Sequence, residues 1–186
     1  MASTTLYHAS KTPILEPSPF HGRKNADMGQ GFYLSPDEEF SLLWAKEGWY
    51  INVYEFRDDG LKVETLKINE RWFDTVFQNR NFAQDAYSDA DVVIAPIAND
   101  TLFDLVGILT SGFVPKPVCL KVLSLEPKFT QIVLKNQKSI ANLRFLDSRI
   151  VTKEEAKRSQ IKADKLSEEF LSKAMKALGH YGDILS

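Results

Sequence analysis

The stretch from Gly22 to Ser35 combines residue types that could bind a phosphorylated ligand. Arg23 and Lys24 are cations that can neutralise phosphate, and the planar guanidinium of arginine matches phosphate oxygens in two places. Gly29 and Gly31 permit unusual backbone dihedrals and the close approach of a ligand. A solvated turn in front of an amphipathic helix is the alternative interpretation, and the spacing alone does not decide between them.

Several familiar catalytic patterns are missing from the sequence. The run Gly29-Gln30-Gly31 lacks the third glycine of a dinucleotide-binding loop, and neither a metalloprotease helix nor a Gly-x-Ser-x-Gly elbow occurs. His8, His21 and His180 form no spaced pair of metal ligands, so we expect no metal. Cys119 lies in an apolar run with no histidine nearby, which favours a buried, inert thiol over a nucleophile.

Composition places broad limits on the function. The 186 residues suffice for one core, and 25 acidic and 23 basic residues give a formal net charge of -2 at pH 7. This balance gives no overall field that attracts nucleic acid or an anionic membrane, so any nucleic-acid contact would use a local patch. A single cysteine excludes an intramolecular disulfide, and neither a leader pattern nor an apolar run of about eighteen residues occurs. We therefore expect a cytoplasmic protein without a membrane span.

Hydrophobic periodicity predicts an α+β fold in which strands and helices mix without a regular βαβ rhythm. The turn signal Asp58-Asp59-Gly60 predicts that the strands on either side of it form a hairpin. The run 118–123 fits either a strand or the tail of a helix, and the sequence does not decide. The expected strands are 4–10, 32–34, 50–56, 61–66, 91–96, 129–134 and 144–151.

Capping signals indicate where the helices begin. Ser35 and Glu38 form a capping-box pattern with Pro36 at the first helical position, which predicts a helix that ends near Gly48. Further helices are expected from Asn69 with Trp72, Phe73, Val76 and Phe77 on its core face, from Asn99 or Asp100 to about Gly112, and from Gln137 to Leu143.

A long helix is expected after Thr152, which forms a capping-box pattern with Glu155, because no glycine or proline follows until Gly179. We therefore divide the chain into a domain of residues 1–151 and a helical extension of residues 152–186. Packing of the helix on the protein's own core is favoured; self-association or contact with an inhibitory partner protein through residues 152–178 is the alternative. Its apolar stripe contains Ala163, Leu166, Phe170, Leu171, Ala174, Ala177 and Leu178.

Four segments, taken in order, resemble an uncharacterised bacterial family with the ADP-ribosyltransferase fold. They read LYHAS at 6–10, GRKNADMGQGFYL at 22–34, DVVIAPIANDT at 91–101, and QIVL at 131–134 followed by SIA at 139–141. The resemblance covers residues 5–147 and implies a split β core with flanking helices, followed by the long C-terminal helix expected after Thr152. It also implies the NAD chemistry of diphtheria-toxin-like transferases of the histidine, tyrosine and glutamate type.

The resemblance assigns roles to particular side chains. In those transferases a histidine on the first strand binds the adenosine-side ribose of NAD, a tyrosine stacks on the nicotinamide, and a glutamate on a later strand holds the nicotinamide-side ribose. These roles fall on His8, Tyr33 and Gln131, the expected catalytic residues, with NAD as co-substrate. The expected NAD-binding residues are His8, Ala9, Arg23, Lys24, Asp27, Gly31, Phe32, Tyr33 and Asp100.

Two positions depart from the pattern of that family. Ala9 stands where such proteins often have a glycine whose backbone holds the carboxamide, and main-chain hydrogen bonds survive the change if the dihedrals allow. Gln131 stands in place of the glutamate, and a neutral amide supplies neither negative charge to a developing oxocarbenium ion nor a general base. Asp100 and Asp27 are the candidates for a carboxylate that compensates.

The expected function is transfer of ADP-ribose from NAD to a protein or nucleic acid by a mono-ADP-ribosyltransferase. Such an enzyme would act as a bacterial toxin or effector, and membership of a toxin–antitoxin pair is one form of this expectation. One alternative is a non-catalytic NAD-binding or interaction module that has lost the acid. Another is different chemistry on the same fold, as an NAD glycohydrolase or an RNA 2'-phosphotransferase. The last would be expected to have a richer basic groove than Arg23, Lys24 and Arg80 suggest.

Overall fold

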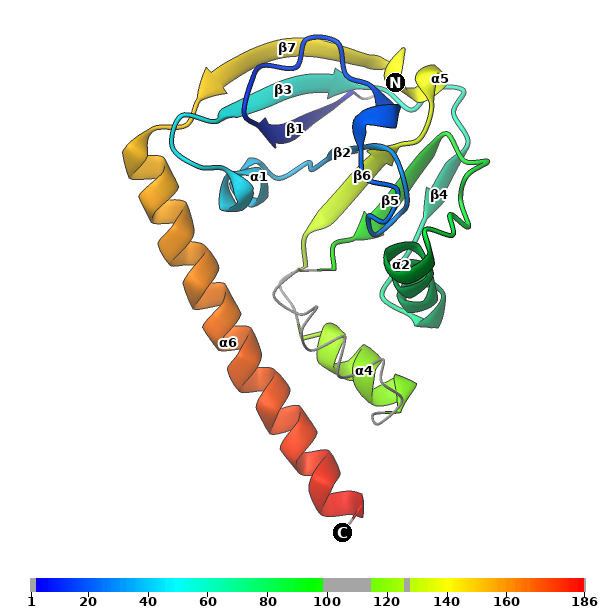
Figure 1. Ribbon diagram of the computed structural model, residues 1–186, viewed down its shortest axis with the longest axis vertical. Coiled ribbons are helices and arrows are strands. Elements are labelled where there is room, and N and C mark those ends of the chain that lie inside the picture. The colour runs from blue at the N-terminus through cyan, green and yellow to red at the C-terminus, as the bar shows by residue number, and fades with distance from the viewer. Residues whose placement is uncertain (1–2, 99–114, 126–127, 186) are drawn as a thin grey trace.

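In the computed structural model, which describes residues 3–98, 115–125 and 128–185, the chain forms two β-sheets flanked by helices (Figure 1). The first sheet is antiparallel, in the order β1 (Thr4–Ser10), β3 (Tyr50–Phe56), β7 (Leu143–Ile150). The second has the order β2 (Phe32–Leu34), β6 (Thr130–Leu134), β5 (Val92–Pro96), β4 (Val63–Thr65). With five α-helices among the described residues, the α+β class expected from the sequence is confirmed.

The two sheets meet where β1 passes β2. The backbone N–H of Tyr7 donates to the carbonyl of Ser35 at 2.8 Å, and the N–H of Ser35 donates back to Tyr7 at 3.0 Å. Apolar side chains from both sheets also pack together and form a buried core. This core contains Leu6, Phe32, Leu34, Tyr54, Phe56, Val92, Ile132 and Leu134. The junction therefore fixes the position of β1 relative to β2.

The hairpin expected around Asp58-Asp59-Gly60 is wrong. A turn does form there, since the N–H of Leu61 donates to Asp58 at 3.1 Å. However, β3 already pairs with β1 on one side and β7 on the other, so its sheet offers no free edge beside it. The chain beyond the turn instead enters the second sheet, where β4 pairs in parallel with β5.

Helix α1 (Glu38–Trp44) is shorter than expected and is capped by a different residue. The side chain of Asp37, not Ser35, accepts the hydrogen bond from the first turn of the helix. Ser35 is unavailable as a cap because its hydroxyl donates to a β6 carbonyl and accepts from the Asp37 N–H. The helix ends at Trp44 with Ala45 as its C-cap, and Gly48 lies beyond it with a φ of 76°.

The next helices follow the sequence more closely. Asn69 caps α2 (Glu70–Phe82) as expected, and Trp72 and Val76 are buried on its inner face. The run left open at 118–123 belongs to α4 (Lys116–Leu123), in which Cys119 is buried. Burial raises the pKa of the Cys119 thiol. A short helix, α5 (Gln137–Ile140), precedes β7, and a 3-10 turn, η1 (Pro19–His21), lies in the loop after β1. The helix expected from Asn99 or Asp100 lies outside the described residues.

Helix α6 (Lys153–Leu185) extends from the end of β7 past α1 and α4 (Figure 1). Its start is confirmed, because the N–H of Glu155 donates to the Thr152 hydroxyl at 3.2 Å. Phe170 and Ala174 are buried in a core cluster with side chains of α2 and both central strands of the second sheet. The stripe thus packs on the protein's own core, although Leu171 is exposed. None of the described helices combines the length and apolarity needed to cross a membrane.

Candidate functional site

A cleft with a volume of about 330 Å³ lies at the junction of the two sheets. Its walls come from β1, β2, β6, α1, the loop before β2, and residues at the ends of α2 and β5. The cleft brings together six of the residues that the sequence singled out: His8, Ala9, Arg23, Asp27, Tyr33 and Gln131. Residues from distant parts of the chain therefore share one site.

The remaining predicted residues do not line this cleft. Lys24 is exposed outside the cleft. Phe32 is buried, and its ring packs against His8 with a distance of 4.7 Å between the ring centroids. A Cβ at Gly31 would lie 2.5 Å from a methyl group of Val133, which shows that this glycine permits close packing on β6. Asp100 lies outside the residues that the structure describes.

His8 is held in one tautomer by the strand beside it. Its Nδ1 lies 2.7 Å from the carbonyl oxygen of Tyr33. Because a carbonyl only accepts hydrogen bonds, Nδ1 carries the proton, and Nε2 is the acceptor in the neutral ring. Burial lowers the pKa of His8, which favours this neutral form. The imidazole is thus prepared to accept a hydrogen bond from a ligand hydroxyl.

Tyr33 presents its ring to the cleft and uses its hydroxyl to hold the preceding loop. The hydroxyl donates to the Gly29 carbonyl at 2.6 Å and accepts from the Met28 N–H at 3.0 Å. Burial raises the pKa of Tyr33, so the hydroxyl remains protonated. With the hydroxyl engaged, the flat face of the ring is what Tyr33 offers to a ligand.

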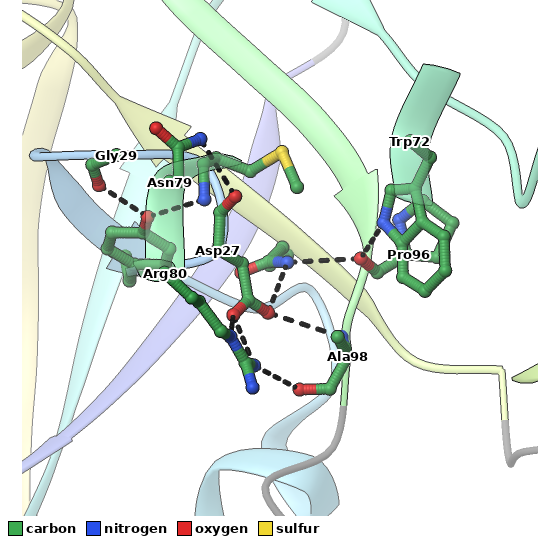
Figure 2. A network of polar contacts seen from close by, with 10 residues as sticks. Asp27, Gly29, Trp72, Asn79, Arg80, Pro96 and Ala98 are labelled. Atoms are coloured by element: carbon green, nitrogen blue, oxygen red, sulfur yellow. Dashed lines mark hydrogen bonds and ion pairs between the residues drawn. The ribbon is translucent and has the colours of Figure 1, made fainter. Parts of the chain in front are cut away.

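Asp27 is the centre of a buried polar network (Figure 2). Arg80 from α2 contacts its Oδ1 through two nitrogens, and Oδ2 accepts from the Ala98 N–H at 3.2 Å and the Gln131 amide at 3.3 Å. Burial raises the pKa of the Asp27 carboxyl, and its ion pair with Arg80 opposes that rise. Four contacts fill the acceptor positions of a carboxylate, so Asp27 has none left to act as a general base.

Gln131 uses both of its amide hydrogens inside this network. Its Nε2 donates to Asp27 and, at 3.0 Å, to the carbonyl of Pro96, which also accepts from the Trp72 indole at 3.0 Å (Figure 2). Among the described residues no partner is found for Oε1 of Gln131. Among the described residues, Oδ1 of Asn79 is the one fully buried side-chain polar atom without a partner. Oε1 of Gln131 has no partner either, so it is not fully buried. Because Gln131 lines the cleft, we infer that this oxygen faces the cleft.

Helix α1 gives the cleft an aromatic wall that the sequence did not indicate. Phe40 and Trp44 both line the cleft, with ring centroids 6.1 Å apart. The ring of Phe40 also packs on that of Phe129, and the two ring centroids lie 4.8 Å apart. Trp44 has 44% of its surface exposed. It thus offers a flat apolar face at the mouth of the cleft.

Arg80 was considered only as a basic groove residue and not among the expected site residues, although the helical pattern contains a signal for it. It follows Val76 by four residues and Trp72 by eight, which places it on the buried face of α2. A charged side chain on such a face needs a buried partner. Here the partner is Asp27, 53 residues away in the sequence.

The cleft combines three kinds of group that can contact a ligand. His8 and Gln131 supply hydrogen-bond acceptors, Tyr33 and Trp44 supply aromatic faces, and the exposed Arg23 supplies a cation at the edge. Within the described ranges, no three His, Cys, Asp or Glu side chains are grouped so as to hold a metal ion.

The chain matches the model of a protein family. The match covers residues 4–145, a range that contains all the cleft residues and ends before α6. No curated protein matches the sequence. Because the match extends over more than half of the 186 residues, the chain belongs to the family described as protein of unknown function (DUF3990).

Proposed function

We propose that the cleft binds NAD and that the protein transfers ADP-ribose to a macromolecular acceptor. The observation that carries this proposal is the convergence of His8 on β1, Tyr33 on β2 and Gln131 on β6 in a single cleft, with Arg23 at its edge. The resemblance assigns the two riboses and the nicotinamide to His8, Gln131 and Tyr33, and the guanidinium of Arg23 suits the pyrophosphate. They come from both sheets, so local sequence does not account for their meeting.

The geometry supplies several requirements of the reaction. Breaking the nicotinamide glycosidic bond develops oxocarbenium character on the ribose, so the nicotinamide must be held and the ribose oriented. Tyr33 and Trp44 give aromatic faces for the nicotinamide, and Nε2 of His8 accepts a hydrogen bond from a ribose hydroxyl. A volume of about 330 Å³ is near the lower limit for ligand sites, about 300 Å³. We infer that the cleft encloses only part of NAD and that the pyrophosphate passes Arg23.

Incubation of the protein with NAD labelled in its adenylate part, in the presence of a cell lysate, tests this proposal. Label should become attached to a protein or nucleic acid, and His8→Ala and Tyr33→Ala should abolish the attachment. His21→Ala is the matched control, because His21 is exposed on the loop outside the cleft. Equal labelling by His8→Ala and the control would refute the site, and free ADP-ribose as sole product would assign a glycohydrolase.

A non-catalytic NAD-binding module is the second candidate, and the state of Asp27 favours it. Asp27 is the one acidic residue among the described residues of the cleft, and its oxygens are occupied by Arg80, Ala98 and Gln131. Among the described residues that line the cleft, no carboxylate is therefore available to stabilise a cation. Calorimetry separates the candidates: heat of NAD binding without release of nicotinamide over hours supports the module.

A further inference from the structure

The contact between Asp27 and Gln131 determines which end of the Gln131 amide meets the cleft. Nε2 of Gln131 lies 3.3 Å from Oδ2 of Asp27 and 3.0 Å from the carbonyl oxygen of Pro96. A carboxylate and a carbonyl both accept hydrogen bonds, so the amide nitrogen and not the oxygen must face them. Turning the amide over would place three oxygens together in a buried site, at the cost of two hydrogen bonds.

Asp27 is itself rigidly placed, which allows it to impose this orientation. The backbone carbonyl of Asp27 accepts from the Asn79 amide at 3.0 Å, and its carboxylate pairs with Arg80 (Figure 2). The side chains of Asp27 and Arg80 are only 11% and 10% exposed. Arg80 also donates to the Ala98 carbonyl at 2.8 Å, so the guanidinium is held from two sides. The carboxylate thus has one position available to it.

We propose that Asp27 is a positioning residue, which holds the Gln131 amide so that the cleft presents a neutral oxygen acceptor to a hydrogen-bond donor such as a ribose hydroxyl. The orientation of the amide does not depend on what the ligand is. Its identification with the nicotinamide-side ribose of NAD rests on the proposed function.

The pairing also explains why a carboxylate does not suit position 131 in this chain. Gln131→Glu would place a second carboxylate against Asp27 at the distance of a hydrogen bond, and two such groups cannot both ionise without strong repulsion. At low pH a shared proton would keep the contact, whereas at higher pH the contact would become repulsive. The glutamine and Asp27 therefore form a matched pair.

Two measurements test the orientation without any ligand. The first is hydrogen exchange of the side-chain NH₂ of Gln131 by NMR, with Gln160 as control, because the Gln160 amide bonds only to an exposed Asp164. We expect exchange at Gln131 to be slower by about tenfold or more. The second is the melting temperature of Gln131→Glu, which should fall relative to the wild type as the pH rises from 5 to 8. Equal exchange rates, or a pH-independent difference, would overturn the inference.

Binding measurements test whether Asp27 acts through Gln131. Gln131→Met keeps the length of the side chain and removes the acceptor, so NAD affinity should fall by about tenfold. Asp27→Asn should weaken binding similarly, and the double variant should be no weaker than Gln131→Met alone. Additive losses would show a merely structural role for Asp27. Absence of NAD binding by the wild type would refute the proposed function, while the exchange and melting experiments would still decide the orientation, even if Asp27→Asn did not fold.

Discussion

Replacement of Arg80 by methionine removes the cation that neutralises Asp27 but keeps a long side chain on α2. The two side chains are only 10% and 11% exposed, so little water can replace the lost partner. Removing one member of a buried ion pair costs about 3–5 kcal/mol, because the other charge is left uncompensated. We therefore expect Arg80→Met to lower the free energy of unfolding by about 3–5 kcal/mol, a large part of the ~5–15 kcal/mol typical of a domain.

This cost should depend on pH and on Asp27. Burial raises the pKa of Asp27, and Arg80 lowers it. Without Arg80, the pKa of Asp27 in the folded variant therefore lies above its value in the unfolded chain. Such a group stabilises the fold at low pH, and its contribution is lost as the pH rises through the folded pKa. The difference between wild type and Arg80→Met should therefore shrink on acidification. Adding Asp27→Asn should recover part of the loss at neutral pH.

Urea unfolding followed by circular dichroism measures these differences, with Arg71→Met as the matched control. Arg71 is also on α2 but pairs with Glu64 at 3.6 Å on the surface, with side-chain exposures of 62% and 33%. Its replacement should cost less than about 1 kcal/mol. The reasoning is refuted if Arg80→Met costs no more than Arg71→Met, or if Asp27→Asn adds its full cost to that of Arg80→Met.

Three further replacements test the surroundings of the site. Tyr33→Phe keeps the ring but leaves the loop groups bonded to its hydroxyl without a partner, so unfolding free energy should fall by about 1–3 kcal/mol while NAD binding measured by calorimetry survives. Phe170→Ala should cost about 3–5 kcal/mol in a urea titration, and Met175→Ala, 66% exposed on the same helix, less than about 0.5 kcal/mol; equal costs would contradict the packing of α6. The Lys138 ammonium holds the pKa of Asp91 below its usual range, so this carboxylate stabilises the fold above its unfolded pKa of about 3.9 and loses that effect as the pH falls through the folded pKa. Asp91→Asn should flatten the fall in melting temperature below about pH 4, and an unchanged slope would speak against the ion pair.

Local patterns in the sequence predict the elements of this fold better than their partners. The alternation in 50–56 and the apolar run 92–96 each produce a strand, because side-chain burial on one or both faces is recorded in the chain itself. The choice of partner depends on which sheet edges are free, and that is a property of the whole fold. For this reason the turn at Asp58-Asp59-Gly60 is found from sequence while the pairing of β4 is not.

The candidate site shows the same division. The resemblance located His8, Tyr33 and Gln131, which line one cleft, but it contained no information about Arg80. Asp27 was considered as a compensating acid, and the structure shows its carboxylate occupied by other groups. Asp27 lies 53 residues from Arg80 and 104 residues from Gln131 in the sequence, so no local spacing reveals these contacts. The burial of a cation on a helical face was the available signal.

The cleft and the core share the loop 22–31, and this bears on how variants must be interpreted. The loop is held by Tyr33 at Gly29 and by the buried Lys135, which donates to the Met28 carbonyl and pairs with Asp85 at 2.6 Å. Loss of NAD binding after a change at Lys135 or Asp85 can therefore follow from movement of the loop alone. Trp44 differs, because it lines the cleft from α1 and is 44% exposed, so its side chain contributes less to the core. An effect of a Trp44 variant on NAD binding without an effect on stability would thus identify a direct contact with the ligand.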